Sequence, residues 1–177
     1  MTGKKPKLLK AHITHLEMRA RPTRLIAVPS RPRLALLQSQ EMPIHYYRYL
    51  YEQIGKAHHW YERRKLNDEE LKLIIHAEAT DIEVLYANGN PAGYFELAPG
   101  VETGDIEIVY FGILPDYQGL GLGKWFLNSA IQRAWDLSPE RVIVHTNTLD
   151  HPAALQLYQK MGFSPYAVSE EEVAVWE

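Results

Sequence analysis

The chain has 177 residues, which is long enough for one domain with a substantial core. Its apolar (46%) and charged (23%) fractions are those of a soluble globular protein, and no apolar run approaches the roughly 18–20 residues of a membrane span. The absence of cysteine excludes disulfides, thiolate metal sites and a cysteine nucleophile. No apolar segment follows the N-terminal lysines, so we predict no signal peptide and a cytoplasmic location.

The net charge of −3 conceals an asymmetry. Residues 1–33 hold nine lysines and arginines against the single Glu17, so the rest of the chain is acidic. A basic arm can bind nucleic acid, but this one lacks the interleaved aromatics that stack on single strands. We therefore expect a solvated tail and an exposed edge strand, and do not favour a nucleic-acid partner.

The first third of the chain carries weak strand signals. Residues 1–10 are expected to form a disordered basic tail, and 13–18 and 34–37 short strands. Three prolines between Arg21 and Pro32 indicate a loop or an edge excursion.

A helix is predicted around Tyr47, Leu50, Tyr51 and Ile54, which share one face at i, i+3, i+4 and i+7, with Gly55 as its C′ residue. Histidines and aromatics crowd residues 45–64. A metal site is not favoured there, because adjacent histidines point apart and no third ligand is evident.

The middle of the chain predicts a capped helix followed by an antiparallel meander. Asn67 is a helix cap with Glu70 three residues later. Residues 82–87 and 92–97 are expected as strands, joined by an Asn88-Gly89 hairpin turn. The next strand, 105–113, should run antiparallel to its predecessor.

The remaining elements are predicted from periodicity and breakers. A buried helix should follow the Gly-rich turn and end at Ser138-Pro139. A strand over 141–146, a helix from about 150 to 161 and two short strands over 163–168 and 173–176 complete the order. This order predicts an α/β (α+β) fold with a mixed, mostly antiparallel sheet and no internal repeat.

The most informative stretch is the Gly-rich turn after the strand ending at Ile113. Glycines at 119, 121 and 123 permit positive φ, and the helix that follows offers unpaired amides and the positive end of its dipole. Such a turn binds phosphate. Trp125 stands where a P-loop needs Ser or Thr, and the glycine register differs from that of a Rossmann turn.

Residues 118–123, Gln-Gly-Leu-Gly-Leu-Gly, match the Gln/Arg-x-x-Gly-x-Gly/Ala signature. Here the chain resembles the GCN5-related N-acetyltransferase (GNAT) superfamily, and the resemblance is good over residues 82–163. It implies a central sheet that is splayed at the cofactor site and flanked by helices. It also implies acetyl-CoA as cofactor, with its pyrophosphate on the loop and its pantetheine arm along the splayed strand. The implied cofactor-binding residues are Phe111, Gly112, Ile113, Gln118, Gly119, Leu120, Gly121, Leu122, Gly123, Lys124, Asn147 and Ala154.

Transfer of an acetyl group to an amine needs a base for the ammonium, a donor for the oxyanion and a proton for the thiolate. The resemblance places the general base at Glu107. Burial on an apolar strand, whose face we expect it to share with Val109, Phe111 and Ile113, should raise its pKa. Glu96 on the preceding strand is the competing candidate.

Residues 150–163 resemble the signature Asn-x-x-Ala-x-x-Leu-Tyr-x-Lys-x-Gly-Phe, which implies that Tyr158 is the general acid near the coenzyme A sulfur. His151 stands where the signature has asparagine, so Asn147 is expected to substitute in holding the cofactor. His145 is expected to be a core histidine.

The resemblance implies that residues 11–177 form one GNAT domain, with an acceptor-site part at 11–80 and an acetyl-CoA-binding core at 81–177. Tyr47, Tyr51 and Trp60 are the candidate acceptor-binding residues. The expected partner is a small-molecule or peptide amine, with no membrane partner, and family habit leaves a homodimer open. The alternatives are a noncatalytic acyl-CoA sensor and an acetyltransferase associated with nucleic acid.

Overall fold

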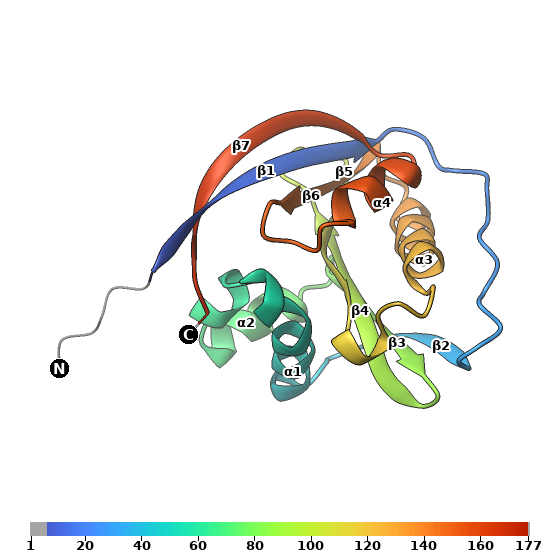
Figure 1. Cartoon of the computed structure of the whole chain (residues 1–177), viewed down its shortest axis with the longest axis horizontal. Helices are drawn as coiled ribbons and strands as arrows, with labels where there is room; N and C mark the ends of the chain where they lie inside the picture. Colours follow the sequence, from blue (N-terminus) through green and yellow to red (C-terminus); the bar gives the residue numbers. More distant parts are fainter. Residues whose placement is uncertain (1–6, 177) are drawn as a thin grey trace.

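The computed structural model describes residues 7–176, and these form one seven-stranded sheet with helices on both faces (Figure 1). The strands lie in the order β2-β3-β4-β5-β6-β1-β7, and every neighbouring pair is antiparallel except β5–β6. This is the predicted α+β architecture. The strands are β1 Leu8–Met18, β2 Leu34–Gln38, β3 Asp81–Ala87, β4 Asn90–Pro99, β5 Asp105–Ile113, β6 Arg141–Asn147 and β7 Ser164–Ala174. The helices are α1 Ile44–Gly55, α2 Asp68–Ile75, α3 Gly123–Asp136 and α4 Ala154–Lys160, with 3₁₀ turns η1 Lys56–His58, η2 Glu62–Lys65 and η3 Pro115–Tyr117.

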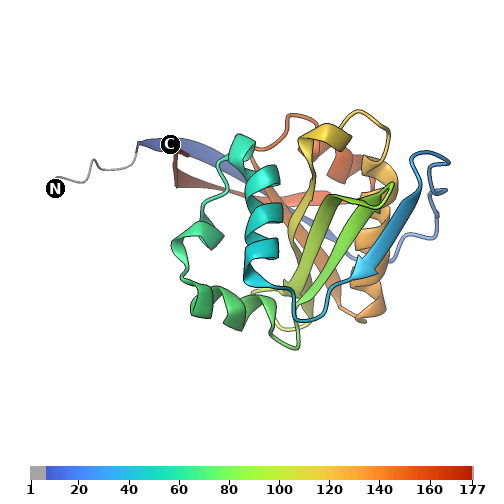
Figure 2. The ribbon, with the colours of Figure 1, turned by 90° about the horizontal axis from the view of Figure 1, so that it is seen from below.

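Two hydrophobic cores lie on opposite faces of the sheet. The stripe of α3, which includes Phe126, Ala130 and Ile131, packs on one face. The predicted face of α1 packs with α2 on the other, where Tyr47 and Leu50 are fully buried. The two views in Figures 1 and 2 agree that α1 and α2 lie across the β3–β4 hairpin from α3.

The turn and cap predictions are confirmed. Asn88 and Gly89 both have positive φ (52° and 86°) between β3 and β4. Asn67 accepts from the amide of Glu70, whose side chain accepts from the amide of Asn67, so α2 begins with a complete capping box.

Because this cap satisfies two amides that would otherwise be unpaired, Asn67→Ala should lower the free energy of unfolding by about 1 kcal/mol. Urea unfolding measures the change. Glu69→Gln, in the same helical turn but without a cap bond, is the control and should change stability by less than about 0.5 kcal/mol. Equal midpoints for the two variants would contradict this assignment.

Three predictions are wrong: two concern the ends of the chain and one concerns the end of α1. β1 begins at Leu8, so the predicted tail includes three strand residues; residues 1–6 lie outside the described part. The two final short strands are one strand, β7, because it pairs with β1 along its length. Gly55 is the last residue of α1 and has φ −78°, so it is not a C′ residue beyond the helix end. A larger side chain would not fit at this position, because the Trp60 side chain packs against it.

Two irregularities in β5 shape the region beside it. Glu96 pairs with Tyr110 but Leu97 pairs with Ile108, so Val109 is an extra, bulged residue. The bulge places Glu107 on the face of Tyr110, towards α1, whereas Phe111 faces α3 and packs on Phe126. The prediction that Glu107 shares a face with Phe111 and Ile113 is therefore wrong.

The second irregularity is a fork between β5 and β6. Their parallel pairing runs only from Asp105–Arg141 to Ile108–Val144, although β5 continues to Ile113 and β6 to Asn147. Beyond Ile108 the two strands diverge, and this side of β5 has no strand partner. The sheet is therefore splayed, as the resemblance implied.

Candidate active site

A cavity of about 880 Å³ occupies the fork between β5 and β6. Its volume falls within the range of small-molecule sites, roughly 300–1,000 Å³. Most of the predicted cofactor-binding residues line it, and so do Tyr51, Trp60 and Tyr158. The lining residues predicted for the cofactor are Phe111, Gly112, Ile113, Gln118, Gly119, Gly121, Leu122, Gly123, Lys124, Asn147 and Ala154. Leu120, Glu107 and Tyr47 are not among the lining residues.

The Gly-rich loop forms one end of the cavity. Gly119 and Gly121 both have φ +75°, and no atom lies within 4 Å of where a Cβ would be, so each leaves open space. The side chain of Gln118 donates to the carbonyl of Ile113 (3.1 Å), which ties the loop to the end of β5. No side chain caps the start of α3, so its first amides are available to a ligand.

Gly112 allows α1 to approach β5 closely beside the cavity. A Cβ at this position would lie 2.3 Å from Cγ2 of Ile54. The glycine therefore keeps the diverging part of β5 in contact with α1, and both residues contribute to the wall.

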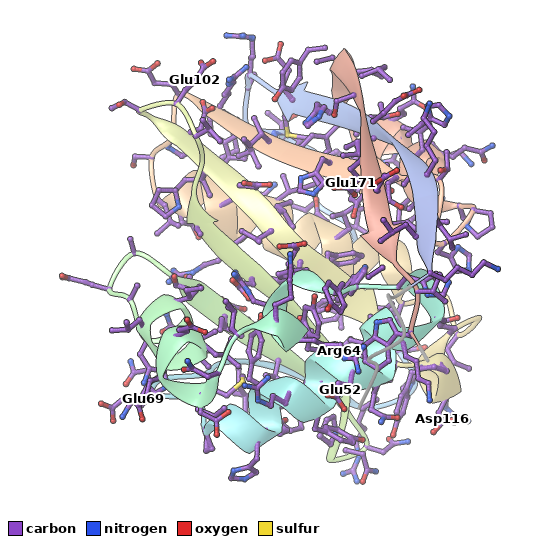
Figure 3. All side chains as sticks on the ribbon, turned by 90° about the vertical axis from the view of Figure 1, so that its left-hand side faces the viewer. Glu52, Arg64, Glu69, Glu102, Asp116 and Glu171 are labelled. Atoms are coloured by element: carbon purple, nitrogen blue, oxygen red, sulfur yellow. The ribbon has the colours of Figure 1, made fainter. Side chains whose placement is uncertain are left out.

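The segment of residues 56–65 forms the wall across from the fork. Nε1 of Trp60 donates to Oδ1 of Asp150 (3.3 Å), and Trp176 donates to the carbonyl of Trp60 (2.8 Å). Arg64 stacks over Trp176, with its guanidinium carbon 3.7 Å from the ring centroid. These contacts join the segment to the loop after β6 and to residues following β7. Figure 3 shows this side of the molecule, with Arg64 on the segment and Glu171 on β7.

The two adjacent histidines of this segment have separate partners. Nδ1 of His58 bonds to the carbonyl of Leu149, and Nδ1 of His59 accepts from the amide of Trp176. Within residues 7–176, no three side chains of metal-ligating type converge on a cation position.

Glu107 reaches the cavity only through His145. Nδ1 of His145 donates to Oε1 of Glu107 (3.0 Å), since a carboxylate can only accept. The hydrogen bond to Glu107 raises the pKa of His145, against the opposing effect of burial. The His145 side chain is 45% exposed and lines the cavity, so the expectation of a core histidine is wrong.

Tyr158 lies on α4 and is 7% exposed. Burial raises the pKa of its phenol, and the charge of Asp150 adds to the effect. The hydroxyl therefore keeps its proton at neutral pH, which is the state that a proton donor requires.

Glu96 and Tyr47 belong to a buried network away from the cavity. The fully buried Glu96 accepts from Nη2 of Arg63 (2.6 Å) and from the hydroxyl of Tyr47 (2.5 Å). Burial opposes the charge of Arg63, but the neighbouring Glu96 outweighs it and raises the pKa of the guanidinium. Both oxygens of Glu96 are thus occupied.

The loop after β6 is organised by Asp150, which sequence reasoning missed. Oδ2 of Asp150 accepts from the hydroxyl of Thr146 and the amide of Asn147. Nδ1 of His151 accepts from the amide of Ala153, so the histidine in the usual asparagine position bonds the backbone before α4. The signal for Asp150 was an acidic residue just after a strand and before a helix.

If the Gly-rich loop binds the diphosphate, Gly121→Ala should weaken coenzyme A binding about tenfold or more, a loss of about 1.4 kcal/mol. The new methyl group would occupy the open space and strain the positive φ. Gly89→Ala is a matched control, because Gly89 also has positive φ and free space but lies in the β3–β4 hairpin. Calorimetry with coenzyme A should show full affinity for the control; full affinity for both variants would remove the loop from the site.

Comparisons with known proteins agree with this architecture. Residues 39–163 match the model of the Acetyltransferase (GNAT) family. Because that match covers more than half of the chain, the protein belongs to the GNAT acetyltransferase family.

Relatives with curated names are mycothiol acetyltransferases. The one from Paenarthrobacter aurescens is 30% identical over 108 residues, which cover 61% of this chain and 30% of the relative. The one from Cellulomonas flavigena is 35% identical over 71 residues, covering 40% of this chain and 20% of the relative. The chain thus spans less than a third of the length of either.

Among solved structures, a putative GNAT acetyltransferase from Novosphingobium aromaticivorans is similar with a TM-score of 0.65 and 12% identity, covering 97% of this chain and 67% of that one. A GCN5-related N-acetyltransferase from Sphaerobacter thermophilus has a TM-score of 0.58 and 15% identity, covering 96% and 53%. At these identities the likeness concerns the fold. Within the described residues, no helix has the length and apolar character needed to cross a bilayer.

Proposed function

We propose that the protein is an N-acetyltransferase that moves the acetyl group of acetyl-CoA to a primary amine by direct attack in a ternary complex. The observation that carries the proposal is the start of α3, which no side chain caps. It lies beside Gly119 and Gly121, which leave free space and line the cavity at the fork. Family membership and acetyltransferase relatives support the acetyl-transfer chemistry. A cytoplasmic location is part of the proposal.

The cavity offers hydrogen-bonding groups for two parts of the acyl donor, its diphosphate and its pantetheine arm. Amides of the loop and of the first turn of α3 would hold the diphosphate. The unpaired side of β5 at Phe111, Gly112 and Ile113 would hydrogen-bond the amides of the pantetheine arm. Bound in this way, acetyl-CoA would supply a thioester within the cavity that Tyr158 and His145 both line.

Acetyl transfer forms a bond between the amine nitrogen and the acetyl carbon and breaks the carbon–sulfur bond. The ammonium loses two protons in all, the departing sulfur gains one, and one proton leaves to solvent. Tyr158 is the proposed donor to sulfur, because its phenol is protonated and lines the cavity. The Glu107–His145 pair is the proposed base.

The acceptor would enter from the side of the segment 56–65 and β7. Trp60 and Tyr51 line this part, with Tyr110 packed against both (ring centroids at 4.9 and 5.1 Å). Tyr47 does not belong to the proposed acceptor site, because its hydroxyl donates to Glu96 and its side chain does not line the cavity. A small-molecule or peptide amine is the acceptor class that we propose.

The test is release of free coenzyme A from acetyl-CoA by the purified protein with a panel of small amines, amino acids, aminoglycosides and peptides. Turnover that depends on the amine is the expected result. Binding of acetyl-CoA without turnover across the panel would instead favour the noncatalytic acyl-CoA sensor.

A further inference from the structure

We propose that the proton acceptor for the amine is Nε2 of His145, and that Glu107 is a positioning residue that acts through the ring. This inference rests on the proposed function and assigns the base within it. It differs from the sequence hypothesis, in which Glu107 itself takes the proton.

His145 lines the cavity and Glu107 does not. Val144 makes the last pair with Ile108, so His145 is the first β6 residue beyond the fork. Side chains alternate along β6, and Val144 faces the core of α3, so His145 faces the other side. It lines the cavity there, whereas Glu107 lies one step before the fork and is not part of the lining.

The hydrogen bond to Glu107 fixes the orientation of the His145 ring. Because Nδ1–H is given to Glu107, the neutral ring carries its free lone pair on Nε2. A carboxylate that fixes the tautomer of an imidazole and stabilises its protonated form is the arrangement that makes histidine an effective base. Glu107 is 19% exposed and contacts the ring directly, so it has the geometry for this task.

The charges around the His145 ring favour its protonated form. Glu107 on β5, Glu171 on β7 and Asp150 after β6 all favour the protonated ring. The ring of His15 on β1 is a neighbour, with its centroid 5.9 Å from that of His145 and its Nε2 bonded to Ser169 Oγ (2.8 Å). These three carboxylates stabilise a proton that the imidazole takes from the acceptor.

Two variants distinguish His145 from Glu107 as the base. His145→Gln should reduce turnover with the best amine of the panel by about 10²–10⁴-fold, the usual worth of a positioned base. Glu107→Gln keeps the shape of the side chain but removes its charge, so the His145 pKa should fall and the rise of rate with pH should move to lower pH. His45→Gln is the control, because His45 is exposed on α1 and does not line the cavity, and it should keep the wild-type profile.

NMR titration of the free protein gives a readout that needs no turnover. The imidazole signal missing in His145→Gln identifies the residue, and its pKa should lie above 6.5 in the wild type and fall in Glu107→Gln. The inference is overturned if His145→Gln retains activity within about threefold, or if Glu107→Gln leaves the His145 titration unchanged. A wild-type protein that never turns over with any amine instead defeats the proposed function, and the inference falls with it.

Discussion

Glu96→Ala is expected to cost more stability than any other single substitution considered, about 3–5 kcal/mol of unfolding free energy. The substitution removes the carboxylate that accepts from Nη2 of Arg63 and from the hydroxyl of Tyr47, which leaves the charge of the Arg63 guanidinium (15% exposed) without a counter-ion inside the protein. At roughly 2–4 °C per kcal/mol for a chain of this size, the melting temperature should fall by about 10 °C.

Glu62→Ala is the matched control. Glu62 forms an ion pair with Lys65 in the same segment, at 2.5 Å, but both side chains are well exposed. Water screens such a pair, so its loss should cost no more than about 1 kcal/mol. The double variant Glu96→Leu/Arg63→Met should lose less stability than Glu96→Ala, since it leaves no charge unpaired. Equal melting temperatures for the two single variants would show that the buried pair is not a stabilising element.

The network also matters for the site, because Arg63 belongs to the segment 56–65, whose other residues include His58, Trp60 and Lys65 of the cavity wall. Its guanidinium contacts Glu96 on one side and the ring of Tyr110 on the other, 5.3 Å from the centroid. Breaking the pair should therefore increase hydrogen exchange in residues 56–65 more than in β3 or β4.

Tyr158→Phe is expected to have the largest effect on turnover after loss of the base, about 10²–10³-fold, with little change in the binding of acetyl-CoA. The substitution removes one oxygen, and that hydroxyl makes no hydrogen bond to another described residue. Stability should thus stay within about 1 kcal/mol of wild type. Steady-state kinetics separates the loss in kcat from any change in KM.

Tyr49→Phe is the control, because Tyr49 lies on α1, is 45% exposed and does not line the cavity. It should leave kcat unchanged. A Tyr158→Phe protein with wild-type kcat would show that sulfur departs without a proton from this phenol.

The sequence was most informative where one local pattern has one structural meaning. The hairpin at Asn88-Gly89 and the cap at Asn67 follow from side-chain and backbone chemistry within four residues, and both were predicted correctly. The Gly-rich loop was also located from a local pattern. Gly119 and Gly121 adopt a positive φ that other residues avoid.

Features that depend on how strands pair with one another could not be predicted. The bulge at Val109 arises from register between β4 and β5, and it reverses the face of every later residue of β5. Glu107 and His145 are 38 residues apart in the sequence, and they meet only because β5 pairs in parallel with β6. The continuity of β7 depends on β1, whose first residues resembled a polar tail.

The most direct test of the account is a crystal structure of the protein with coenzyme A. We expect the diphosphate within hydrogen-bond distance of main-chain amides of residues 119–124, the pantetheine arm along residues 111–113, and the sulfur at the fork beside Tyr158 and His145. A coenzyme bound elsewhere, or a fork that stays empty at saturating coenzyme A, would contradict it.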